Sequence, residues 1–468
     1  MSAPFTLAQA AGWTGGEVLR GDPACEFSGV STDTRTVGAG QLFVAIHGPN
    51  HDAHAYTGQA AAAGAAGLLV ERDRPLPTDV PAELPVLAVD DTTAGLGALA
   101  AGHRAEFSGP VIAITGSNGK TTTKEMCAAI LGTQAPCLKN RGNLNNEYGL
   151  PLTLLERGPQ HRAAVVEIGM NHRGEIARLA ALARPTIAVI TNVGTAHIEH
   201  LGSRDEIARE KGDILLGLDA TGVAVLNADD PRVLEQAERA PGRVLTFAHD
   251  ADADVRAERV TSLGERGFAF DLVAPEGRQP VHVSGLGDVT VANAVAAAAA
   301  ALAAGCTLSD VAEGLAAYQP IGGRMERVTL PRNVIVINDT YNANPQSMEV
   351  ALRSLADLRG SSRGVAVLGD MGELGAGAAD AHRATGRLAA ELGVDFLFTL
   401  GELANVTAEG AIAAGMDSDR VHAAADADEL VGALRPLLQG NDWVLVKGSR
   451  SMRMERVVEA LAHSGDKK

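Results

Sequence analysis

The chain has 468 residues, of which 46% are hydrophobic and 21% charged, and this length predicts roughly three globular domains. Forty basic and 57 acidic side chains give a net charge of −17, which argues against a nucleic-acid or anionic-membrane partner. The four cysteines form no Cys-x-x-Cys pair and the sequence opens without a basic, apolar leader, so we expect a cytoplasmic protein that does not insert into a membrane.

The first part of the chain, to about residue 88, mixes strands and helices. Residues 40–48, GQLFVAIHG, predict a strand bounded by glycines, and residues 61–71 predict an alanine-rich helix leading into another strand. Asp33 and Arg35 precede the first of these strands. Arginine suits bidentate phosphate binding, and a surface ion pair is the alternative, so the residues alone leave both interpretations open.

A candidate phosphate-binding loop follows in residues 111–126, VIAITGSNGKTTTKEM. The usual pattern is G-x-x-x-x-G-K-[ST]. Here the end of the pattern fits, but Ile114 stands where the first glycine is expected, and a glycine lies two places later at Gly116.

The surroundings of this loop favour a phosphate site. Residues 111–115 predict a buried strand, and Thr121 onward predicts a helix with Met126 and Ile130 on one side. A strand, a turn of small residues and a helix N-terminus bring several backbone N–H groups around one anion. Lys120 adds a positive charge, and the Thr121 hydroxyl can bind Mg²⁺. The motif alone does not separate a kinase, a GTPase, a motor and a ligase.

Two later strands end in side chains that could bind a cation. Glu167 ends the strand predicted at 163–169, and a carboxylate beside a phosphate loop suits Mg²⁺, although a solvated strand end is the alternative. His197 follows the strand predicted at 186–194. Magnesium prefers oxygen ligands, so the residues alone favour an ordinary loop histidine.

Asparagines and glycines are dense in residues 140–151, NRGNLNNEYGLP. Such a composition usually marks turns, but Asn143, Asn145 and Asn146 also form a neutral, donor-rich surface suited to phosphate or amide groups. Further on, the alanine-rich run at 291–305 predicts a buried helix.

The third part of the chain, after the Pro/Gly-rich stretch that begins at Tyr318, alternates strands with helices. This alternation predicts a parallel, doubly wound sheet, whose ligands lie at the carboxyl ends of the strands. Asp339, Asp370, Gly401 and residues 447–450 fall at such ends, so we expect this edge to face the ATP site. Lys447 and Arg450 could hold an anionic substrate there, or be solvated charges.

Taken together, these segments resemble the Mur ligases, the ATP-dependent amide-forming enzymes of bacterial cell-wall synthesis. The family's phosphate loop is similar to T-G-x-x-G-K-[TS], which stands at residues 115–121, so the missing first glycine is the family's usual variant. The other segments that carry the resemblance are STDTRTVGAGQLFVAIHG, DAHAY, VVEIGMNHRGEI, TNVGTAHIEHLGS and REKGDIL.

The resemblance implies an α/β protein of three domains. These are a UDP-muramoyl substrate-binding domain (1–88), a central P-loop ATPase domain with a mostly parallel sheet (89–320), and a C-terminal Rossmann-like, doubly wound domain (321–468). The segments GNLNNEYGLPLTLL, NDTYNANPQSM, LGDMGELG and VKGSRSMRME resemble the branch that adds D-alanyl-D-alanine to UDP-N-acetylmuramoyl-tripeptide. The resemblance therefore implies these two substrates, ATP and Mg²⁺, and we expect a monomer that closes its domains on ATP.

The resemblance also implies roles for individual residues. ATP would contact Gly116, Ser117, Asn118, Gly119, Lys120, Thr121, Thr122, Asn293, Arg324 and Asp339. Metal ions would be held by Thr121, Glu167, His197 and a carbamylated Lys211. Lys120, His197 and Lys211 would be catalytic, and the substrates would contact Asp33, Arg35, Asn143, Asn145, Asn146, Lys447 and Arg450.

Lys211 is the least obvious of these assignments. It lies in a charged helical segment, DEIAREKGDIL, where a solvated face is the default interpretation. Carbamylation would turn its cation into an anionic, oxygen-bearing group suited to Mg²⁺. Because the reaction needs a neutral amine, it requires that Lys211 be desolvated and its pKa lowered.

Two alternatives share the phosphate loop. Another amide ligase of the same superfamily, such as a folylpolyglutamate synthetase, would have the same metal positions, but the uridine-type first part argues against it. A P-loop NTPase switch would hydrolyse ATP slowly, without dependence on an acceptor amine.

Overall fold

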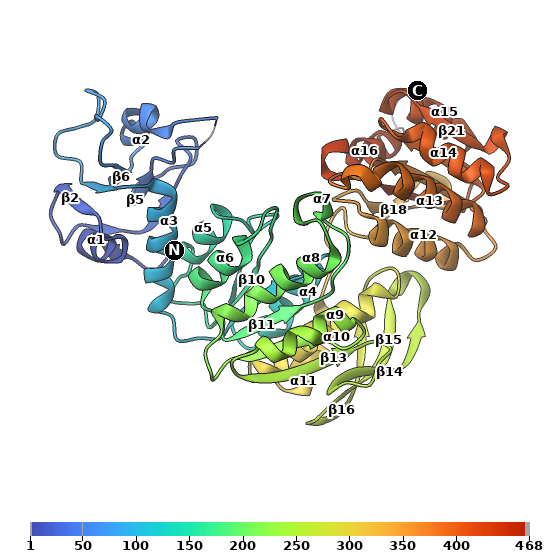
Figure 1. The fold of residues 1–468 in the computed structure, drawn as a ribbon, viewed down its shortest axis with the longest axis horizontal. Coiled ribbons are helices and arrows are strands. Elements are labelled where there is room, and N and C mark those ends of the chain that lie inside the picture. The colour runs from blue at the N-terminus through green and yellow to red at the C-terminus, as the bar shows by residue number, and fades with distance from the viewer. Residues whose placement is uncertain (1, 49, 464–468) are drawn as a thin grey trace.

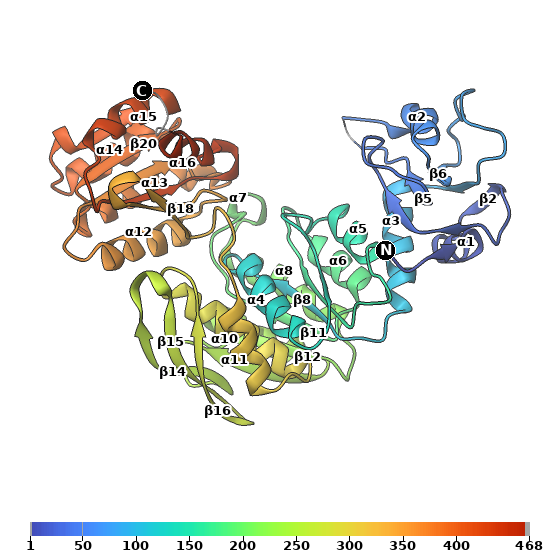
Figure 2. The ribbon, with the colours of Figure 1, turned by 180° about the vertical axis from the view of Figure 1, so that it is seen from behind.

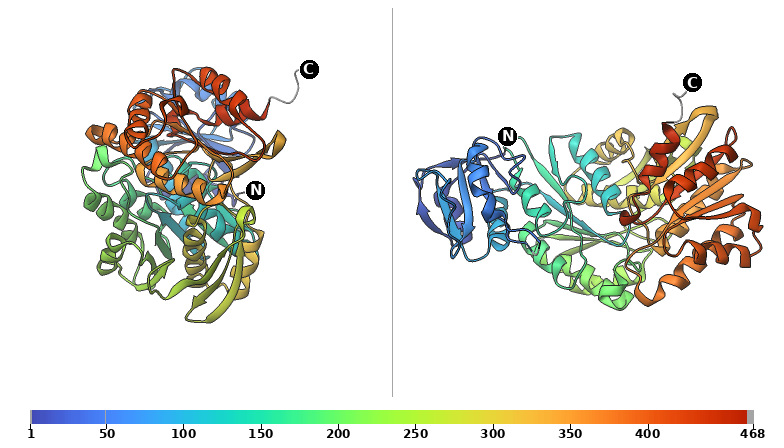
Figure 3. Two further views of the ribbon diagram at one scale, coloured as in Figure 1. Left: turned by 90° about the vertical axis from the view of Figure 1, so that its right-hand side faces the viewer. Right: turned by 90° about the horizontal axis from the view of Figure 1, so that it is seen from above.

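The computed structural model describes residues 2–48 and 50–463. Within these residues, three sheets of five or more strands occupy successive stretches of the chain, at 17–89, 111–283 and 326–447. The three parts lie in a row, with the central part between the N-terminal and C-terminal parts (Figures 1 and 3). The predicted α/β class is confirmed.

The N-terminal sheet has the strand order β2-β7-β6-β5-β4, parallel except for the β2–β7 pair. Its elements are β2 (Glu17–Arg20), β4 (Gly29–Ser31), β5 (Gln41–Val44), β6 (Gly67–Glu71), β7 (Val86–Val89), α1 (Leu7–Thr14) and α2 (Thr57–Ala62), with β1 (Phe5–Thr6) and β3 (Glu26–Phe27) paired beside it. The helix expected at the start of 61–71 ends at Ala62, because the chain turns at Gly64, whose φ is +103°.

The central sheet has the order β16-β15-β14-β13-β12-β11-β8-β10-β9, and only β15 and β16 add in antiparallel fashion among the described strands. The strands are β8 (Val111–Thr115), β9 (Cys137–Lys139), β10 (Ala163–Glu167), β11 (Ile187–Ile190), β12 (Val223–Asn227), β13 (Arg243–Ala248), β14 (Val255–Ser262), β15 (Phe268–Ala274) and β16 (Gly277–Val283). The helices are α3 (Thr92–Ala105), α4 (Lys120–Gly132), α5 (Gly149–Leu155), α6 (Glu175–Ala183), α7 (Ile198–Leu201), α8 (Arg204–Gly212), α9 (Pro231–Leu234), α10 (Val289–Ala303) and α11 (Leu308–Ala317).

Both faces of this sheet are buried, which explains the continuous apolar runs of its strands. Along β8, Val111 and Ala113 belong to the hydrophobic cluster under α3, α5 and α6, while Ile112 and Ile114 belong to the cluster under α4, α10 and α11. Successive side chains of a strand point to opposite faces, so one strand serves both layers. The central helix α10 is almost entirely buried, as its alanine-rich sequence predicts.

The C-terminal sheet has the order β17-β18-β22-β19-β20-β21, parallel except at β17, with helices on both faces. Its elements are β17 (Glu326–Leu330), β18 (Val334–Asp339), β19 (Gly364–Gly369), β20 (Phe396–Leu400), β21 (Val421–Ala424), β22 (Trp443–Lys447), α12 (Pro345–Arg359), α13 (Ala378–Glu391), α14 (Ala404–Ala413), α15 (Ala427–Leu437) and α16 (Glu455–Ala462). The doubly wound C-terminal fold is therefore as predicted.

The hydrophobic core is continuous across one junction and interrupted at the other. One cluster runs from the N-terminal sheet through α3 into the central sheet. Of the described buried residues in the two C-terminal clusters, only Leu286 comes from the central part. The expected domain boundaries at 88/89 and 320/321 fall at the end of β7 and in the segment between α11 and β17.

In the described part of the chain, no helix is long and apolar enough to cross a membrane.

Candidate active site

The phosphate loop joins β8 to α4, and two of its glycines are required by close packing. Gly116 has φ +150°, and a Cβ there would collide with Thr191 Oγ1 at the end of β11. Gly119 has φ +81°, and a Cβ there would collide with Asn293 Oδ1 on α10. The loop is therefore pressed against two neighbouring elements, and only glycine fits at these positions without strain.

Side chains that follow β11 hold the loop in place. Asn192 Oδ1 accepts from Asn118 N at 2.9 Å, and Thr191 Oγ1 donates to Asn118 O at 2.6 Å. The buried Ser117 hydroxyl accepts from Gly194 N at 2.7 Å. With the loop fixed in this way, the first N–H groups of α4 are left without helical acceptors, and the positive end of the helix dipole favours an anion.

Two other basic side chains, Arg324 and Lys211, lie close enough to Lys120 to interact with it electrostatically. Lys120 Nζ donates to Gly116 O at 2.8 Å. Burial lowers the pKa of Lys120, and the Arg324 guanidinium lowers it further, whereas Glu167 raises it. Burial also lowers the pKa of Lys211 well below its ordinary value, and the charge of Lys120 adds to this effect. The site therefore carries positive potential where an anionic phosphate would relieve the repulsion.

Glu167 is joined directly to the first turn of α4. Its Oε2 accepts from the Thr121 hydroxyl at 2.6 Å, and its Oε1 accepts from Asn145 Nδ2 at 2.8 Å. Asn140 holds the backbone at the same residue, since its side chain accepts from Glu167 N at 2.9 Å and donates to Glu167 O at 3.1 Å. A hydroxyl and a carboxylate side by side at a helix N-terminus form a donor set suited to Mg²⁺.

Lys211 lies in α8 and is 2% exposed, so the solvated face that its sequence suggests is wrong. Among the described residues, no hydrogen bond or ion pair involves its ammonium group. The neighbouring Glu210 carboxylate, which raises the pKa of Lys211, instead accepts from Gly174 N and Ile176 N at the start of α6. Lys211 is therefore buried as carbamylation requires, and this burial lowers the pKa of its amine.

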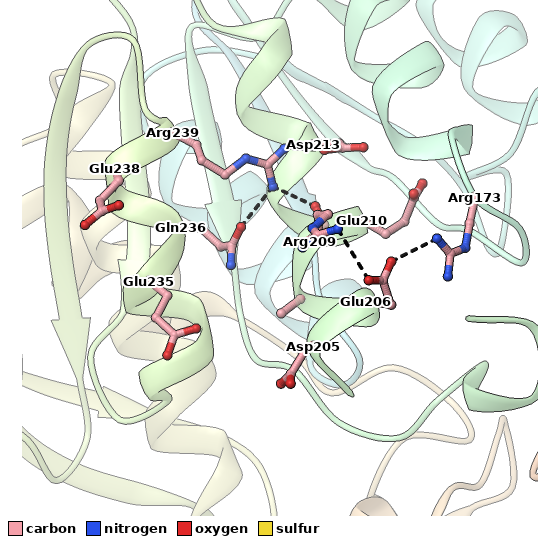
Figure 4. Close-up of a pocket in the computed structure, with 11 residues that line it drawn as sticks. Arg173, Asp205, Glu206, Arg209, Glu210, Asp213, Glu235, Gln236, Glu238 and Arg239 are labelled. Atoms are coloured by element: carbon pink, nitrogen blue, oxygen red, sulfur yellow. Dashed lines mark hydrogen bonds and ion pairs between the residues drawn. The ribbon is translucent and has the colours of Figure 1, made fainter. Parts of the chain in front are cut away.

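A cavity of about 540 Å³ lies along α8 (Figure 4). Its lining is mostly acidic: Arg173, Asp205, Glu206, Ala208, Arg209, Glu210, Asp213, Glu235, Gln236, Glu238 and Arg239. Six carboxylates against three guanidinium groups make this cavity unsuited to a nucleotide. The phosphate loop, not the cavity, therefore carries the candidate chemistry.

The C-terminal part contacts the phosphate loop through the loop that follows β18. Asn344 caps α12 and donates from Nδ2 to Asn118 Oδ1 at 2.8 Å. Gln346 Oε1 accepts from Thr195 N at 3.1 Å and from its hydroxyl at 3.0 Å. The carboxyl end of β18 therefore faces the phosphate loop, which agrees with the orientation expected from the sequence. Neither Asn344 nor Gln346 stood out in the sequence, because their partners lie more than 150 residues away.

Asp339 and Lys447, which the sequence assigned to different ligands, are partners of each other. Lys447 Nζ lies 2.6 Å from Asp339 Oδ2 and also donates to Asn342 O at 2.9 Å. The Lys447 side chain is 2% exposed, so it is not a solvated charge. Arg324, also expected at the adenosine, lies with its guanidinium carbon 3.9 Å from the ring centroid of Tyr341.

The remaining substrate candidates lie in more exposed positions. Arg35 and Asp33 form a bidentate ion pair with a shortest distance of 2.6 Å, and the Arg35 hydrogen bond lowers the pKa of Asp33 to about 2. Asn146 Oδ1 accepts from Gly149 N at 2.9 Å at the start of α5, while Asn143 is exposed. Arg450 is exposed and pairs with Glu455. Of the three asparagines, Asn145 is the one hydrogen-bonded to Glu167.

His197, Asn293 and Thr122 are the remaining site residues expected from the sequence. Asn293 lies against the loop, and its Oδ1 accepts from the Thr123 hydroxyl at 3.3 Å. His197 precedes α7 and contacts Glu373 of the C-terminal part. Thr122, in the first turn of α4, is half-buried.

Comparison with known proteins adds a second line of evidence. Residues 114–301 match the Mur ligase middle domain, and residues 323–450 match the Mur ligase, glutamate ligase domain. The UDP-N-acetylmuramoyl-tripeptide–D-alanyl-D-alanine ligase of Escherichia coli (strain K12) is 38% identical over 98% of this chain and 99% of its own. The crystal structure of MurF from Acinetobacter baumannii has a TM-score of 0.90 at 36% identity and covers 99% of this chain and 100% of that one. MurF ligase from Thermotoga maritima in complex with ADP has a TM-score of 0.80 at 28% identity and covers 92% and 96%.

Proposed function

The chain belongs to the Mur ligase family, and we propose that it joins D-alanyl-D-alanine to UDP-N-acetylmuramoyl-tripeptide with ATP, releasing ADP and phosphate. The product is the pentapeptide precursor of peptidoglycan. Relatives named for this reaction support the assignment, since they match nearly the whole length of the chain. The observation that carries the chemistry is the 2.6 Å contact between Thr121 and Glu167 at the start of the phosphate-loop helix.

An amide does not form readily from a carboxylate and an amine, because a carboxylate is a poor electrophile. The terminal carboxylate of the tripeptide therefore attacks the γ-phosphorus of ATP, the bond to the bridging oxygen breaks, and an acyl phosphate forms with ADP as leaving group. The dipeptide amine then attacks the acyl carbon, loses a proton and expels phosphate. Phosphoryl transfer depends mainly on positioning and charge neutralisation. The N–H groups from Gly116 to Thr122 and the Lys120 ammonium supply both.

ATP use is supported by the ADP complex of the Thermotoga relative. For the adenosine, we assign Asn293, Arg324 and Asp339, with Lys447 holding Asp339 in place through their ion pair. Asn293 lies in the central part and the other two lie beyond α11, so one adenosine would bridge two parts of the chain.

Thr121 and Glu167 fit a magnesium ion, since both present oxygen donors at the phosphate-binding end of α4. When bound, the ion would neutralise charge on the transferred phosphoryl group. Asn140 and Asn145 fix the carboxylate, so its oxygens are positioned before any ligand arrives.

We assign Lys211 and His197 to a second magnesium ion, with Lys211 as its carbamate. The buried, neutral amine attacks the carbon of CO₂: an N–C bond forms, one C–O π bond opens with its electron pair moving to oxygen, and the nitrogen releases one proton. Its lowered pKa supports this step, because only the neutral amine is a nucleophile.

We assign the muramoyl substrate to the N-terminal part, through Asp33 and Arg35, and to the loop that carries Asn143, Asn145 and Asn146. The dipeptide would come to the C-terminal part, near Arg450. We further propose that the chain acts as a monomer with domains at 1–88, 89–320 and 321–468.

The direct test is mass spectrometry of the products formed from ATP, UDP-N-acetylmuramoyl-tripeptide and D-alanyl-D-alanine. We expect the pentapeptide product, and none with folate and glutamate in place of these substrates. Amide formation on folate alone would assign the chain to the folylpolyglutamate synthetases instead.

A further inference from the structure

The candidate metal ligand His197 contacts the C-terminal part of the molecule. Its Nδ1 lies 2.5 Å from Oε2 of Glu373, in the loop between β19 and the 3-10 helix Gly375–Gly377. The backbones of the same two segments also meet, because Glu199 N donates to Glu373 O at 3.4 Å. In Figures 1 and 2, α7, which follows His197, reaches from the central part toward the C-terminal part.

Both residues of this pair have unfavourable backbone conformations. His197 has φ +65° and Glu373 has φ +60°, in the left-handed region that residues other than glycine seldom adopt. Such conformations persist where the surroundings impose them, and they are concentrated at functional sites. Two residues with left-handed backbone conformations therefore meet at one contact between the central and C-terminal parts of the chain.

The Glu373 carboxylate faces a group of imidazoles. Besides His197, the side chains of His200 and His172 lie close enough to the Glu373 carboxylate to interact with it electrostatically. The rings of His172 and His200 lie 5.0 Å apart, centroid to centroid. The Glu373 side chain is thus held on the C-terminal part and presented to the histidine side of the central part.

Metal-binding histidines usually donate their other ring N–H to a carboxylate, which fixes the tautomer and orientation of the ring. We propose that Glu373 is a positioning residue that holds His197 through Nδ1 and leaves Nε2 for the cation, so that the C-terminal part completes the metal site of the central part. The inference rests on the metal role proposed for His197. By linkage, cation binding and approach of the C-terminal part then favour each other by the same factor.

The test uses Mn²⁺ as a paramagnetic probe, with free Mn²⁺ measured by electron paramagnetic resonance in the presence of ADP and bicarbonate. Glu373→Gln removes the charge and keeps the size of the side chain. The matched control is Glu199→Gln, because among the described residues no ion pair involves Glu199, which lies at the same contact. His197→Ala and the double variant His197→Ala/Glu373→Gln complete the cycle, and thermal melts check that each variant folds.

We expect Glu373→Gln to weaken Mn²⁺ binding at one site by about tenfold or more, and Glu199→Gln to leave it unchanged. The double variant should bind Mn²⁺ no more weakly than His197→Ala, because Glu373 acts through that imidazole. Wild-type Mn²⁺ binding by Glu373→Gln, or a further loss in the double variant, would overturn the proposal. Unchanged binding by His197→Ala would overturn both the proposal and the metal role of His197, while pentapeptide formation would remain the separate test of ligation.

Discussion

Lys120 and Lys211 lie in different helices, yet each is desolvated and the two repel each other. Burial and repulsion of the two side chains raise the free energy of the empty site. Binding of anions lowers this free energy again. A phosphate would neutralise Lys120, and carbamylation would make the side chain of Lys211 anionic. The two lysines therefore have different roles although they lie close to each other in one site.

For Lys120→Ala, we predict a loss of turnover of at least about 100-fold, because a cation that neutralises the transferred phosphoryl group is removed. The melting temperature should not fall, since a charge held at a desolvation cost is lost. Phosphate release and thermal unfolding measure the two effects. Lys139→Ala, at a side chain 43% exposed on β9, is the matched control, and near-normal turnover of Lys120→Ala would refute the phosphate-loop assignment.

For Lys211, we predict a stability effect that depends on pH in CO₂-free buffer. The pKa is lowered in the folded state and about 10.5 when unfolded, so between these values the unfolded chain binds more protons and the stability of the unmodified protein rises with pH. Lys211→Met should therefore be more stable than the unmodified protein at pH 7, and the difference should shrink toward pH 10. Urea unfolding at both pH values measures this. A Met variant that is less stable by a constant amount would contradict a desolvated amine.

Lys211→Ala should also lose ligation, and short-chain carboxylates should restore part of it, because a free carboxylate can replace the carbamate oxygens. Phosphate release with and without added formate or acetate measures the rescue. Activity of the variant equal to that of the wild type would show that no carbamate is needed.

At the scale of elements, the phosphate site depends on how β8 turns into α4. The first N–H groups of α4 must lie beside the phosphate loop, so the chain has to turn sharply into the helix. Gly119 permits this turn because it adopts φ +81° beside Asn293. At the other end of the same helix, a Cβ on Gly132 would meet open space in the described structure. One helix therefore carries a required glycine and a replaceable one.

We predict that Gly119→Ala destabilises the protein by about 1–2 kcal/mol through backbone strain alone, and that the collision with Asn293 adds to this loss. It should also raise the KM for ATP. Gly132→Ala should be neutral or stabilising by up to about 1 kcal/mol, because alanine favours the helix. Urea unfolding of both variants gives the comparison, and equal stability of the two would contradict the observed loop geometry.

Elements buried on both faces could be predicted from the sequence. Short, continuous apolar runs such as those of β8 and β19 indicate strands buried on both faces. The helix α10 is apolar on nearly all sides, which indicates a buried helix. The extension of the central sheet through β14 was not predicted from the sequence. Arg256, Glu258 and Arg259 interrupt the apolar residues of β14, and the pairing of β14 with β15 shifts register at a bulge.

Local parts of the candidate site were also predictable, but its contacts were not. Lys120, Thr121 and the acceptor Glu167 follow from strand ends and helix starts. The pairs Asn118–Asn344, Lys447–Asp339 and His197–Glu373 join residues more than 100 positions apart, and no local pattern encodes such a pairing. The sequence therefore predicted which loops lie at the candidate site better than it predicted which side chains contact each other there.

At the scale of the whole molecule, the two junctions differ in kind. The N-terminal and central parts share one hydrophobic cluster through α3, and breaking it would expose apolar surface. The central and C-terminal parts meet through polar contacts near the phosphate loop, which water can replace at small cost. Movement of the C-terminal part is therefore the expected response to a nucleotide that bridges the junction.

We predict that ATP analogue and UDP-N-acetylmuramoyl-tripeptide together reduce the radius of gyration in small-angle X-ray scattering. The N-terminal and central parts should move as one unit. Lys120→Ala should show weaker compaction at the same ligand concentrations. A radius of gyration that does not respond to both ligands would contradict domain closure.

The most direct test of the central claim is the stoichiometry of phosphate release against amide formation with ATP and UDP-N-acetylmuramoyl-tripeptide, with and without D-alanyl-D-alanine. Ligation through an acyl phosphate at this phosphate loop predicts one phosphate for each pentapeptide formed. It also predicts that sustained release needs the tripeptide and the dipeptide together. Steady phosphate release that is indifferent to the dipeptide, with no pentapeptide formed, would contradict the account and indicate a nucleotide hydrolase.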